Sequence, residues 1–486
     1  MEGTVKRTCL NRDDGNILIM SVVIVALLVA TGLGYMRWAA DEKWDSEYER
    51  ATIQAYFVAQ TGLIERGLVF LRTRDPSDLP QGTVILSPGE VKDRPNGEVV
   101  GTHYKNIVTK VAGAGGGNLF QRTDDYDLYS TGRVMFRGRK IHEKLPVERT
   151  ATMRARLRSF ANYMYLTDIE TTVYGEIIWF WTPDTLWGRT HSNDFIGLKY
   201  SPTFYGPIST CKGEFRYYNP QQIYFAYPPV FDAPPVNFPK TAKTLRAGAR
   251  HISSNNGQLM TWIRMEGQGG IDVFQYPLGG TPAESLLFHM APPGWAGLFV
   301  DGEVEVEGVL SGQLTIGSSG DMWLVDNIRY HGANEVTGHF QEDAMNNLLG
   351  LVSESDIIIQ DNFKNGKWNG IEAEPNNQNR HSIVINAGMV ALGESFTFQH
   401  QNDEWDLYKS PTTPDERGYI WLKGAVTQMR RGYVHRSNHV GTGYAKHYYY
   451  DFRFDRRPPP FYLEALDENG HGLFDIISWG EQRPTR

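Results

Sequence analysis

The sequence predicts two parts with different fold classes. The first is an α+β part, in which a long N-terminal helix packs on an antiparallel sheet. The second is a mostly-β body, which we expect to be a right-handed parallel β-helix, with a β-sandwich as the alternative. Three observations support this division: an unbroken apolar run from Ile17 to Tyr35, a helical pattern that continues to about Thr73, and a long remainder rich in short strand-like segments, glycine and proline.

The apolar run has the length of a membrane-spanning helix. It contains 19 residues without a proline or a charge, and about 20 are needed to cross the hydrocarbon core of a bilayer. Lys6, Arg7 and Arg12 precede the run, whereas mostly acidic residues follow it. Because Lys and Arg near the end of a span stay in the cytoplasm, we expect a cytoplasmic N-terminus and a body on the far side of the membrane. An ordinary signal anchor is the alternative interpretation.

The helix carries a narrow stripe of small and apolar residues beyond the membrane. From residue 16 to residue 72 it would be roughly 85 Å long at 1.5 Å per residue. Small residues allow another backbone to approach closely, so the stripe predicts packing against a sheet or against neighbouring helices. The stripe consists of Tyr48, Ala51, Ala55, Ala59, Gly62 and Leu63.

The N-terminal segment resembles a known family. Gly15 stands directly before the apolar helix, and ATIQAYFVAQTGLIERGLVFL follows at 51–71. This combination is similar to the start of PilX-type minor pilins, which belong to the type IV pilin and type II secretion pseudopilin group. The resemblance implies a leader peptide, residues 1–15, that a prepilin peptidase removes by cutting between Gly15 and Asn16. It also implies a helix of residues 16–73 that holds the chain in the inner membrane before assembly, with other pilin or pseudopilin subunits as partners.

Two positions depart from the pattern of this family. Asn16 stands where an aromatic or apolar residue usually begins the mature chain, and Met20 stands where most members have glutamate. A missing glutamate is typical of minor subunits at a filament tip, where no subunit above offers the carboxylate a partner. Since an unpaired carboxylate in lipid is costly, Met20 favours a tip position.

Residues 74–159 are predicted to form the sheet that packs on the second half of the helix. DLYSTGRVMFRGRK and TATMRARLR alternate with a period of two and resemble the corresponding sheet of pilin-like proteins. Asp124, Asp125 and Asp127 offer oxygen ligands suited to a hard cation, but the residue spacing of a calcium loop is absent. We interpret them as a solvated acidic turn and predict no metal site.

Residues 160–465 are predicted to form the β-rich body, followed by a C-terminal tail at 466–486. The rhythm of VEVEGVLSGQLTIGSSGDMWLVDN at 304–327 suggests stacked rungs, which bury their apolar faces only by stacking. LWGRTHSNDFIGL and FYGPISTC resemble a module that follows PilX-type N-termini in bacterial proteins, and this resemblance implies no chemistry. Residues 214–296 resemble no family, and their stretch rich in Pro and aromatics predicts an ordered loop that covers an edge or a rung end.

No arrangement of residues in the sequence predicts catalysis, so we predict that the chain is not an enzyme and binds no cofactor. The carboxylates of Asp403, Glu404 and Asp406 are close enough in sequence for acid–base chemistry, but an exposed loop gives the same pattern. His191 lacks an identifiable acid to orient it. Removal of the leader would leave Cys211 as the one thiol, which excludes a disulfide framework.

The C-terminal part of the body is locally basic and aromatic. Such side chains stack on sugars or bind an anionic surface, so surface polysaccharide is a candidate partner. Cross-strand aromatic packing with extended arginines is the alternative interpretation. Basic residues elsewhere are interspersed with more numerous acids, so no nucleic-acid interface is predicted. The candidate ligand surface consists of Arg430, Arg431, Tyr433, Tyr444, Tyr448 and Tyr450.

Together these features predict a minor pilin or pseudopilin-like subunit at the tip of a filament, for assembly priming, adhesion or cargo contact. It would cross the inner membrane once, with its body in the periplasm or outside the cell, and reach the filament or cell surface after assembly. A membrane-anchored carbohydrate-active β-helix enzyme and a signal-anchored surface-binding protein outside any filament are the alternatives. A pilus, a secretion pseudopilus and a DNA-uptake system are equally compatible with the sequence.

Overall fold

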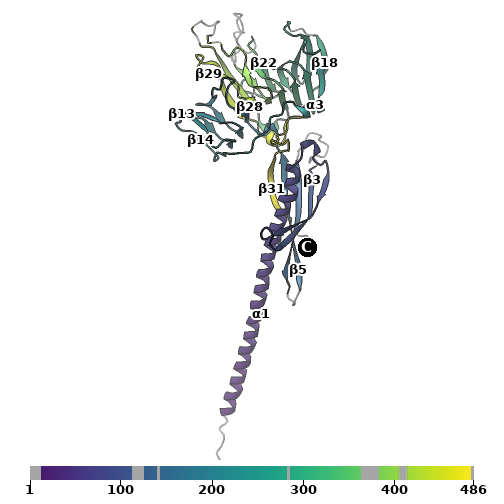
Figure 1. Ribbon diagram of the computed structural model, residues 1–486, viewed down its shortest axis with the longest axis vertical. Coiled ribbons are helices and arrows are strands. Elements are labelled where there is room, and N and C mark those ends of the chain that lie inside the picture. The colour runs from purple at the N-terminus through teal and green to yellow at the C-terminus, as the bar shows by residue number, and fades with distance from the viewer. Residues whose placement is uncertain are drawn as a thin grey trace, which may run out of the picture.

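The chain folds into a long helix, a sheet packed on the second half of that helix, and a β-rich body beyond the sheet (Figure 1). The computed structural model describes residues 13–111, 125–138, 143–281, 285–362, 382–402, 404, 405, 412 and 414–482. The predicted order of a long N-terminal helix and then a mostly-β chain is confirmed.

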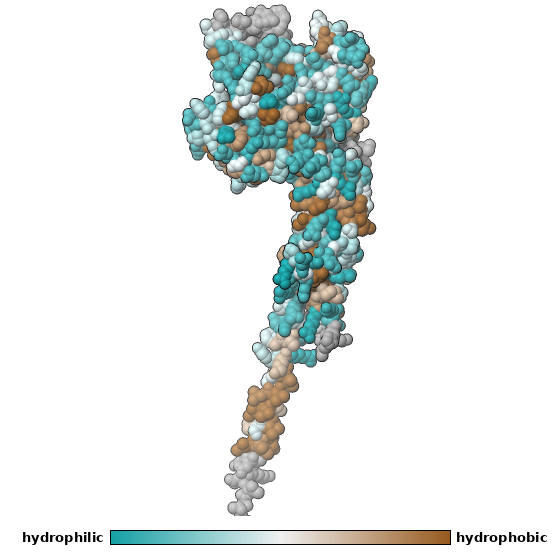
Figure 2. Space-filling model, viewed as in Figure 1, coloured by the Kyte–Doolittle hydropathy of each residue, from teal (hydrophilic) through white to brown (hydrophobic). Residues whose placement is uncertain are grey.

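The N-terminal helix is continuous from the membrane-length run to the sheet. α1 (Asp13–Gly62) passes into a π-helical stretch (Leu63–Leu68) and then into α2 (Val69–Arg72). The helical run from residue 17 to residue 72 is long and apolar enough to cross a membrane. Its first half is bare apolar surface (Figure 2), with side chains that are more than half exposed. Because exposed apolar area costs about 25 cal/mol per Å² in water, this half requires lipid or other apolar partners.

The sheet beside the helix has six antiparallel strands. They are ordered β1-β3-β4-β5-β31, and β2 pairs with the outer part of β3. The strands are β1 (Thr83–Leu86), β2 (Gly89–Lys92), β3 (Val99–Lys110), β4 (Asp125–Arg137), β5 (Lys144–Leu157) and β31 (Phe474–Gln482).

The predicted stripe of small residues packs on this sheet. Ala55 and Ala59 are fully buried, and Gly132 of β4 brings the sheet backbone against the helix backbone. A Cβ at Gly132 would overlap the carbonyl oxygen of Ala55 and lie 2.5 Å from the backbone nitrogen of Ala59. Small residues on both sides therefore set the short distance between helix and sheet, and larger side chains would force the two apart.

The acidic residues interpreted as a solvated turn are ion-paired within the sheet. Asp125 and Asp127 lie on β4 opposite Arg156 and Arg154 of β5, with Nε–Oδ1 distances of 2.6 and 2.7 Å. Asp124 lies outside the described residues. Each described carboxylate is neutralised by the neighbouring strand, so the interpretation as a solvated turn is wrong for these two residues.

The body is inserted into the sheet rather than appended to it. The chain leaves β5 at Leu157, forms the body, and returns as β31, which pairs along β5 in antiparallel register. The segment 466–486, predicted as a tail, therefore supplies the last strand of the sheet, and the prediction is wrong for residues 474–482. Two antiparallel strands connect the body to the sheet, as Figure 1 shows.

An ion-pair cluster fastens this connection. Arg158, on the way into the body, pairs with Asp475, on the way out, at 2.5 Å. Arg189 of the body reaches the same carboxylate at 3.3 Å. Burial alone would raise the pKa of Asp475, but the two guanidinium groups outweigh this effect and lower the pKa. The body is thus tied to both connecting strands.

The body consists of curled sheets of mostly parallel strands, with two long runs of paired strands. The first run contains β15 (Arg250–Ser253), β19 (Ala296–Asp301), β21 (Gln313–Ser318), β23 (Leu348–Ser353), β26 (Gly388–Ala391), β28 (Glu416–Arg430), β6 (Tyr165–Ile169), β9 (Thr190–Ser192) and β12 (Ile208–Thr210). The second run shares β28 and contains β16 (Leu259–Gly267), β20 (Val304–Leu310), β22 (Met322–Tyr330), β24 (Ile357–Ile359), β25 (Ile383–Ile385), β27 (Phe396–Phe398) and β30 (Thr442–Tyr450).

Smaller elements complete the body. One parallel sheet of three strands contains β7 (Trp179–Phe180), β10 (Gly197–Lys199) and β13 (Arg216–Tyr218). A second contains β8 (Thr185–Leu186), β11 (Thr203–Phe204) and β14 (Tyr224–Phe225). β17 (Ile271–Pro277), β18 (Leu286–Met290) and β29 (His435–Arg436) pair in antiparallel fashion, and α3 (Lys243–Gly248) is short. β14 lies at the edge of its sheet, within the segment predicted to cover an edge.

In-register stacking of parallel strands builds the core of the body. Leu298, Ile316, Leu351, Met389 and Val426 occupy matching positions on five successive strands, and each is at most 1% exposed. Burying such a side chain contributes about 1.5–3 kcal/mol. This stacking explains why strands of only three to six residues are stable here.

One junction in this stack is out of chain order. β6 is the first strand of the body, yet it pairs with β28 near the end of the chain, with Tyr165 opposite Val426. Residues 165–218 therefore extend the stack beyond the strands of residues 416–450. The candidate groove described below lies at this junction.

Candidate functional site

The helix stripe, which was predicted to pack against a sheet or against neighbouring helices, packs on the chain's own sheet. Tyr48 is 41% exposed, stacks on Trp44 with a centroid distance of 5.6 Å, and meets Phe136 of β4 edge-on with a centroid distance of 5.5 Å. The predicted processing bond between Gly15 and Asn16 lies near the start of α1, which begins at Asp13. The buried members of the stripe are Ala51, Ala55, Ala59, Gly62 and Leu63.

The opposite side of the same helix carries exposed apolar side chains. Ile53, Phe57 and Ile64 follow one another at steps of four and seven residues, which places them on one side of the helix. Their side chains are 58%, 59% and 47% exposed. We call these three residues the outer helix stripe. It was not predicted, because the buried stripe of small residues already accounted for the helical periodicity.

The predicted ligand surface is divided between the core and the surface. Tyr444 and Tyr450 are 1% and 3% exposed, so the prediction that they contact a ligand is wrong. Arg430 pairs at the surface with Glu394 at 2.9 Å. Arg431, Tyr433 and Tyr448 line a groove between the first strands of the body and its last strands.

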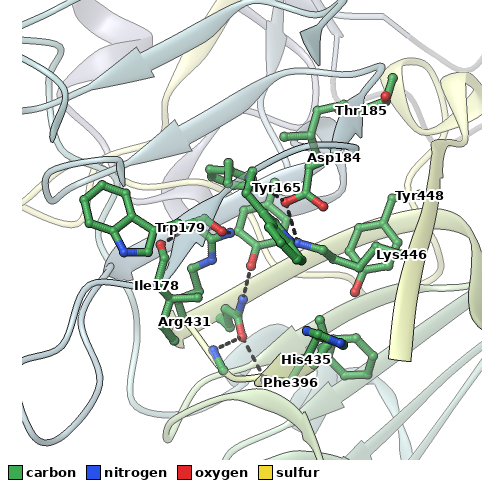
Figure 3. A pocket seen from close by; sticks show the side chains of 16 residues that line it. Tyr165, Ile178, Trp179, Asp184, Thr185, Phe396, Arg431, His435, Lys446 and Tyr448 are labelled. Atoms are coloured by element: carbon green, nitrogen blue, oxygen red, sulfur yellow. Dashed lines mark hydrogen bonds and ion pairs between the residues drawn. The ribbon is translucent and has the colours of Figure 1, made fainter. Parts of the chain in front are cut away.

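This groove has an inner part, whose lining is drawn in Figure 3, and an outer part. The two parts share Ile178, Trp179, Trp181 and His435. The outer part has a cavity volume of about 340 Å³, within the range typical of small-molecule sites. Its walls come mainly from residues 176–181 and residues 433–438, and Lys199 of β10 adds to the lining. The groove therefore exists only because these two distant segments stack against each other.

The inner part is polar but already paired. The Lys446 ammonium points at Asp184 (Figure 3), with an Nζ–Oδ2 distance of 2.5 Å. Burial lowers the pKa of Lys446, although Asp184 opposes this effect. Burial also lowers the pKa of His435, and the charge of Lys446 adds to the shift, so His435 is neutral near pH 7. Among the described residues that line this part, Lys446 and Asp184 pair with each other, and Arg431 pairs with Glu170.

Arg431 holds the two segments together beneath the groove. Its Nη1 lies 2.8 Å from the carboxylate of Glu170, and the two side chains are 2% and 1% exposed. It also donates to the carbonyl oxygens of Ile178 and Trp179 at 3.0 and 3.3 Å. The guanidinium carbon lies 3.6 Å from the ring centre of Phe180. Arg431 is therefore a structural residue of the junction.

The outer part presents aromatic rings and unpaired charge. Tyr433 donates its hydroxyl to Glu176 at 2.9 Å. His435 stacks on Trp181, with ring centres 5.9 Å apart. Lys199 and Arg436 also line this part, and neither has a carboxylate partner among the residues that the structure describes.

Sequence reasoning missed Trp179, Trp181, Lys199 and His435. A usable signal was the alternation of WFW at 179–181, which places Phe180 in the core at 2% exposure and both tryptophans on the other side. No local pattern encodes the stacking of this segment on residues 416–450, so the groove itself was not predictable.

The sequence candidates for catalysis do not form an active site in the described part of the chain. Asp403 and Asp406 lie outside it, and Glu404 lies at the surface, 3.5 Å from His439. His191 is buried and bonded to Ser209 at 2.8 Å and to Asn193 at 3.1 Å. Burial lowers the pKa of His191 to about 4, so this imidazole is neutral and fully hydrogen-bonded.

Comparisons with known proteins leave the function to be argued from the chain itself. No family model matches the chain, and neither a curated protein nor a solved structure matches it. Within the described ranges, no group of three or more His, Cys, Asp and Glu residues is arranged to hold a metal ion.

Proposed function

We propose that this chain is a minor pilin or pseudopilin-like subunit that stands at the tip of a filament. The observation that carries the proposal is the combination of a bare apolar helix with an antiparallel sheet packed on the helix's second half. The bare half suits the membrane before assembly and the apolar centre of a filament afterwards. An isolated anchor does not require a helix that continues for several turns onto a sheet.

The outer helix stripe supports packing with other subunits. Ile53, Phe57 and Ile64 lie on the side of the helix that the sheet leaves open. Neighbouring helices would bury this stripe, and burial of each side chain would stabilise the assembly by about 1–2 kcal/mol, since part of its area is already covered. The stripe begins 18 residues after Tyr35, roughly 27 Å farther along the same continuous helix, so the anchor and the packing surface belong to one element.

Two features support the tip position. The body of roughly 300 residues is inserted between β5 and β31 and is much wider than the helix and sheet (Figure 1). Repeated along a shaft, bodies of this size would collide. Met20 also lacks the carboxylate that would need a partner from a subunit above.

We further propose that the body is a parallel β-helix with an interrupted winding order. In-register parallel pairing over many short strands supports this description. The N-terminus would lie in the cytoplasm, the helix in the inner membrane, and the body in the periplasm or outside the cell. A broad body on two connecting strands, beyond the helix and sheet (Figure 1), is suited to adhesion or to cargo contact.

The mature N-terminus tests the proposal. The full chain is isolated from membranes of cells that carry a prepilin peptidase, and its N-terminus is determined by mass spectrometry. A chain that begins at Asn16 is expected. An intact N-terminal leader would refute processing as a pilin and would favour a signal-anchored surface protein.

Assembly tests the role of the outer helix stripe. Phe57→Glu should remove the protein from sheared filaments, while its membrane level and protease resistance stay unchanged. Glu65→Gln, an exposed substitution on the same helix, should assemble normally. Regular copies along the shaft would disprove the tip position, and turnover of a polysaccharide by the full chain would favour the enzyme alternative.

A further inference from the structure

The outer part of the groove contains two cations without an acidic partner in the described chain. The Nζ atom of Lys199 lies 5.1 and 5.0 Å from the ring centres of Tyr200 and Tyr218. The guanidinium of Arg436 lies 4.5 Å from the ring centre of Tyr433, and its Nε atom is buried without a hydrogen-bond partner. The Nη1 atom of Arg436 also donates a hydrogen bond to the side-chain oxygen of Asn402. Aromatic rings and this neutral amide thus hold the two cations without neutralising their charge.

The remaining charges around the groove do not cancel these two cations. Among the described residues that line the outer part, Glu176 is the one carboxylate, and it already accepts the hydroxyl of Tyr433. In the inner part, Lys446 and Asp184 neutralise each other. The outer part therefore has an excess of positive charge, although the whole chain has a formal net charge of −8. This local reversal of sign favours an anionic ligand.

The aromatic side chains indicate what else the ligand contains. Trp179 lies across Gly197 of the next strand, where a Cβ would be 3.0 Å from the indole Cε3 atom. The glycine therefore lets the indole lie close to the strand backbone. Trp181 lies nearby with His435 against one side. Half-buried indoles offer apolar surface beside polar groups, which suits the C–H face and hydroxyl edge of a sugar ring.

From this juxtaposition we propose that the outer groove binds an acidic saccharide, with sugar rings on Trp179 and Trp181 and a carboxylate between Lys199 and Arg436. Arg436 is suited to a carboxylate because a guanidinium donates charge-assisted hydrogen bonds, although its Nη1 atom already donates to Asn402. Ser437 and Asn438 add hydrogen-bonding groups at the same wall. The proposed function places this site at an exposed tip, and the inference rests on it only for that placement.

Binding to defined oligosaccharides tests the inference. Detergent-solubilised full-length protein is titrated by calorimetry with oligomers of galacturonate, glucuronate and mannuronate, and with the neutral oligomers of the corresponding hexoses. At least one uronate series should bind, at least tenfold more tightly than its neutral counterpart. Its affinity should fall as ionic strength rises, because partly exposed charges are screened. Inorganic phosphate at the same concentration should not compete.

Variants locate the site. Lys199→Gln and Arg436→Gln should each weaken uronate binding about tenfold, and Trp179→Ala should weaken it at least as much. Glu176→Gln should strengthen binding, since it removes the carboxylate of the lining but keeps an acceptor for Tyr433. Lys240→Gln, an exposed lysine outside the lining, is the matched control. Unchanged thermal unfolding shows that each variant is folded.

Specific results would overturn the inference. These are no uronate binding at 10 mM in any series, equal affinity for neutral oligomers, competition by phosphate, or unchanged uronate affinity in both Lys199→Gln and Arg436→Gln. Gel filtration and N-terminal mass spectrometry on the same preparation are independent of saccharide binding. A failure of the saccharide inference is therefore distinguishable from a failure of the proposed function.

Discussion

Removal of the buried arginine at the junction should destabilise the body strongly. Arg431→Met leaves the carboxylate of Glu170, 1% exposed, without its cation. It also removes the donors to the carbonyl oxygens of Ile178 and Trp179. Breaking one partner of a buried ion pair costs about 3–5 kcal/mol. Methionine fills much of the same volume, so the cavity contribution is small, and we expect a loss of about 4 kcal/mol.

A double variant and a substitution of the neighbouring arginine test whether the unpaired buried charge causes the loss of stability. Glu170→Gln combined with Arg431→Met should recover about 2 kcal/mol of the loss, because no buried charge remains. Arg430→Met removes a surface pair with Glu394, whose side chain is 49% exposed, together with a bond to the carbonyl oxygen of Thr171. It should cost only about 1 kcal/mol.

The assay is urea unfolding of the detergent-solubilised full chain, followed by tryptophan fluorescence and by protease cleavage within residues 165–218. Trp179 and Trp181 lie at the junction and should report its opening. Because the chain has more than one folded part, the transition of this segment is compared between variants rather than a single global value. Equal losses for Arg431→Met and Arg430→Met, or no recovery in the double variant, would refute the reasoning.

Three further predictions concern the helix interface, a buried histidine and the C-terminal strand. Gly132→Ala should destabilise the helix and sheet by about 1–3 kcal/mol in thermal unfolding, since its Cβ would meet the helix backbone. Gly82→Ala is the control and should change little, because no atom lies within 4 Å of its Cβ. Equal effects of the two substitutions would contradict the packing argument. His191 has a pKa of about 4 when folded, below its ordinary value of 6.5, so its contribution is fully present above pH 6.5 and is lost as the pH falls toward 4. The loss should reach about 3 kcal/mol. His191→Gln should reduce the pH dependence of the free energy of unfolding, measured in urea between pH 7 and pH 4.5, relative to the wild type. An unchanged pH dependence would be inconsistent with a neutral buried imidazole. Ending the chain after Asp467 should expose the edge of β5 and leave Arg158 without Asp475, so the sheet should aggregate or be cleaved rapidly by protease. A truncated chain as protease-resistant as the full one would show that β31 is dispensable.

The local patterns that predicted the fold are those in which neighbouring residues share one environment. The apolar run after Gly15 and the helical spacing of Ala51, Ala55 and Ala59 predicted one continuous helix and the side of it that is buried. Period-two alternation predicted β4 and β5, and short repeated strands predicted a β-rich body. In each case, the side-chain direction follows from the backbone geometry of a single element.

The contacts between distant segments were not predictable in the same way. Asp125 and Asp127 were interpreted as part of a solvated turn because their partners, Arg156 and Arg154, are about thirty residues away in the sequence, on the neighbouring strand. Tyr444 and Tyr450 read as surface residues because alternation does not say which side of a strand faces the core.

The sequence alone determined the long apolar helix, its small-residue stripe and the β-rich character of the body. The tertiary structure decided that the body is inserted between β5 and β31, and that β6 pairs with β28 out of chain order. The groove exists only at that out-of-order junction, where residues 176–181 meet residues 433–438. The physical reason is that helix and strand periodicity are properties of neighbouring residues, whereas strand pairing depends on which apolar faces remain to be covered after the chain has folded back.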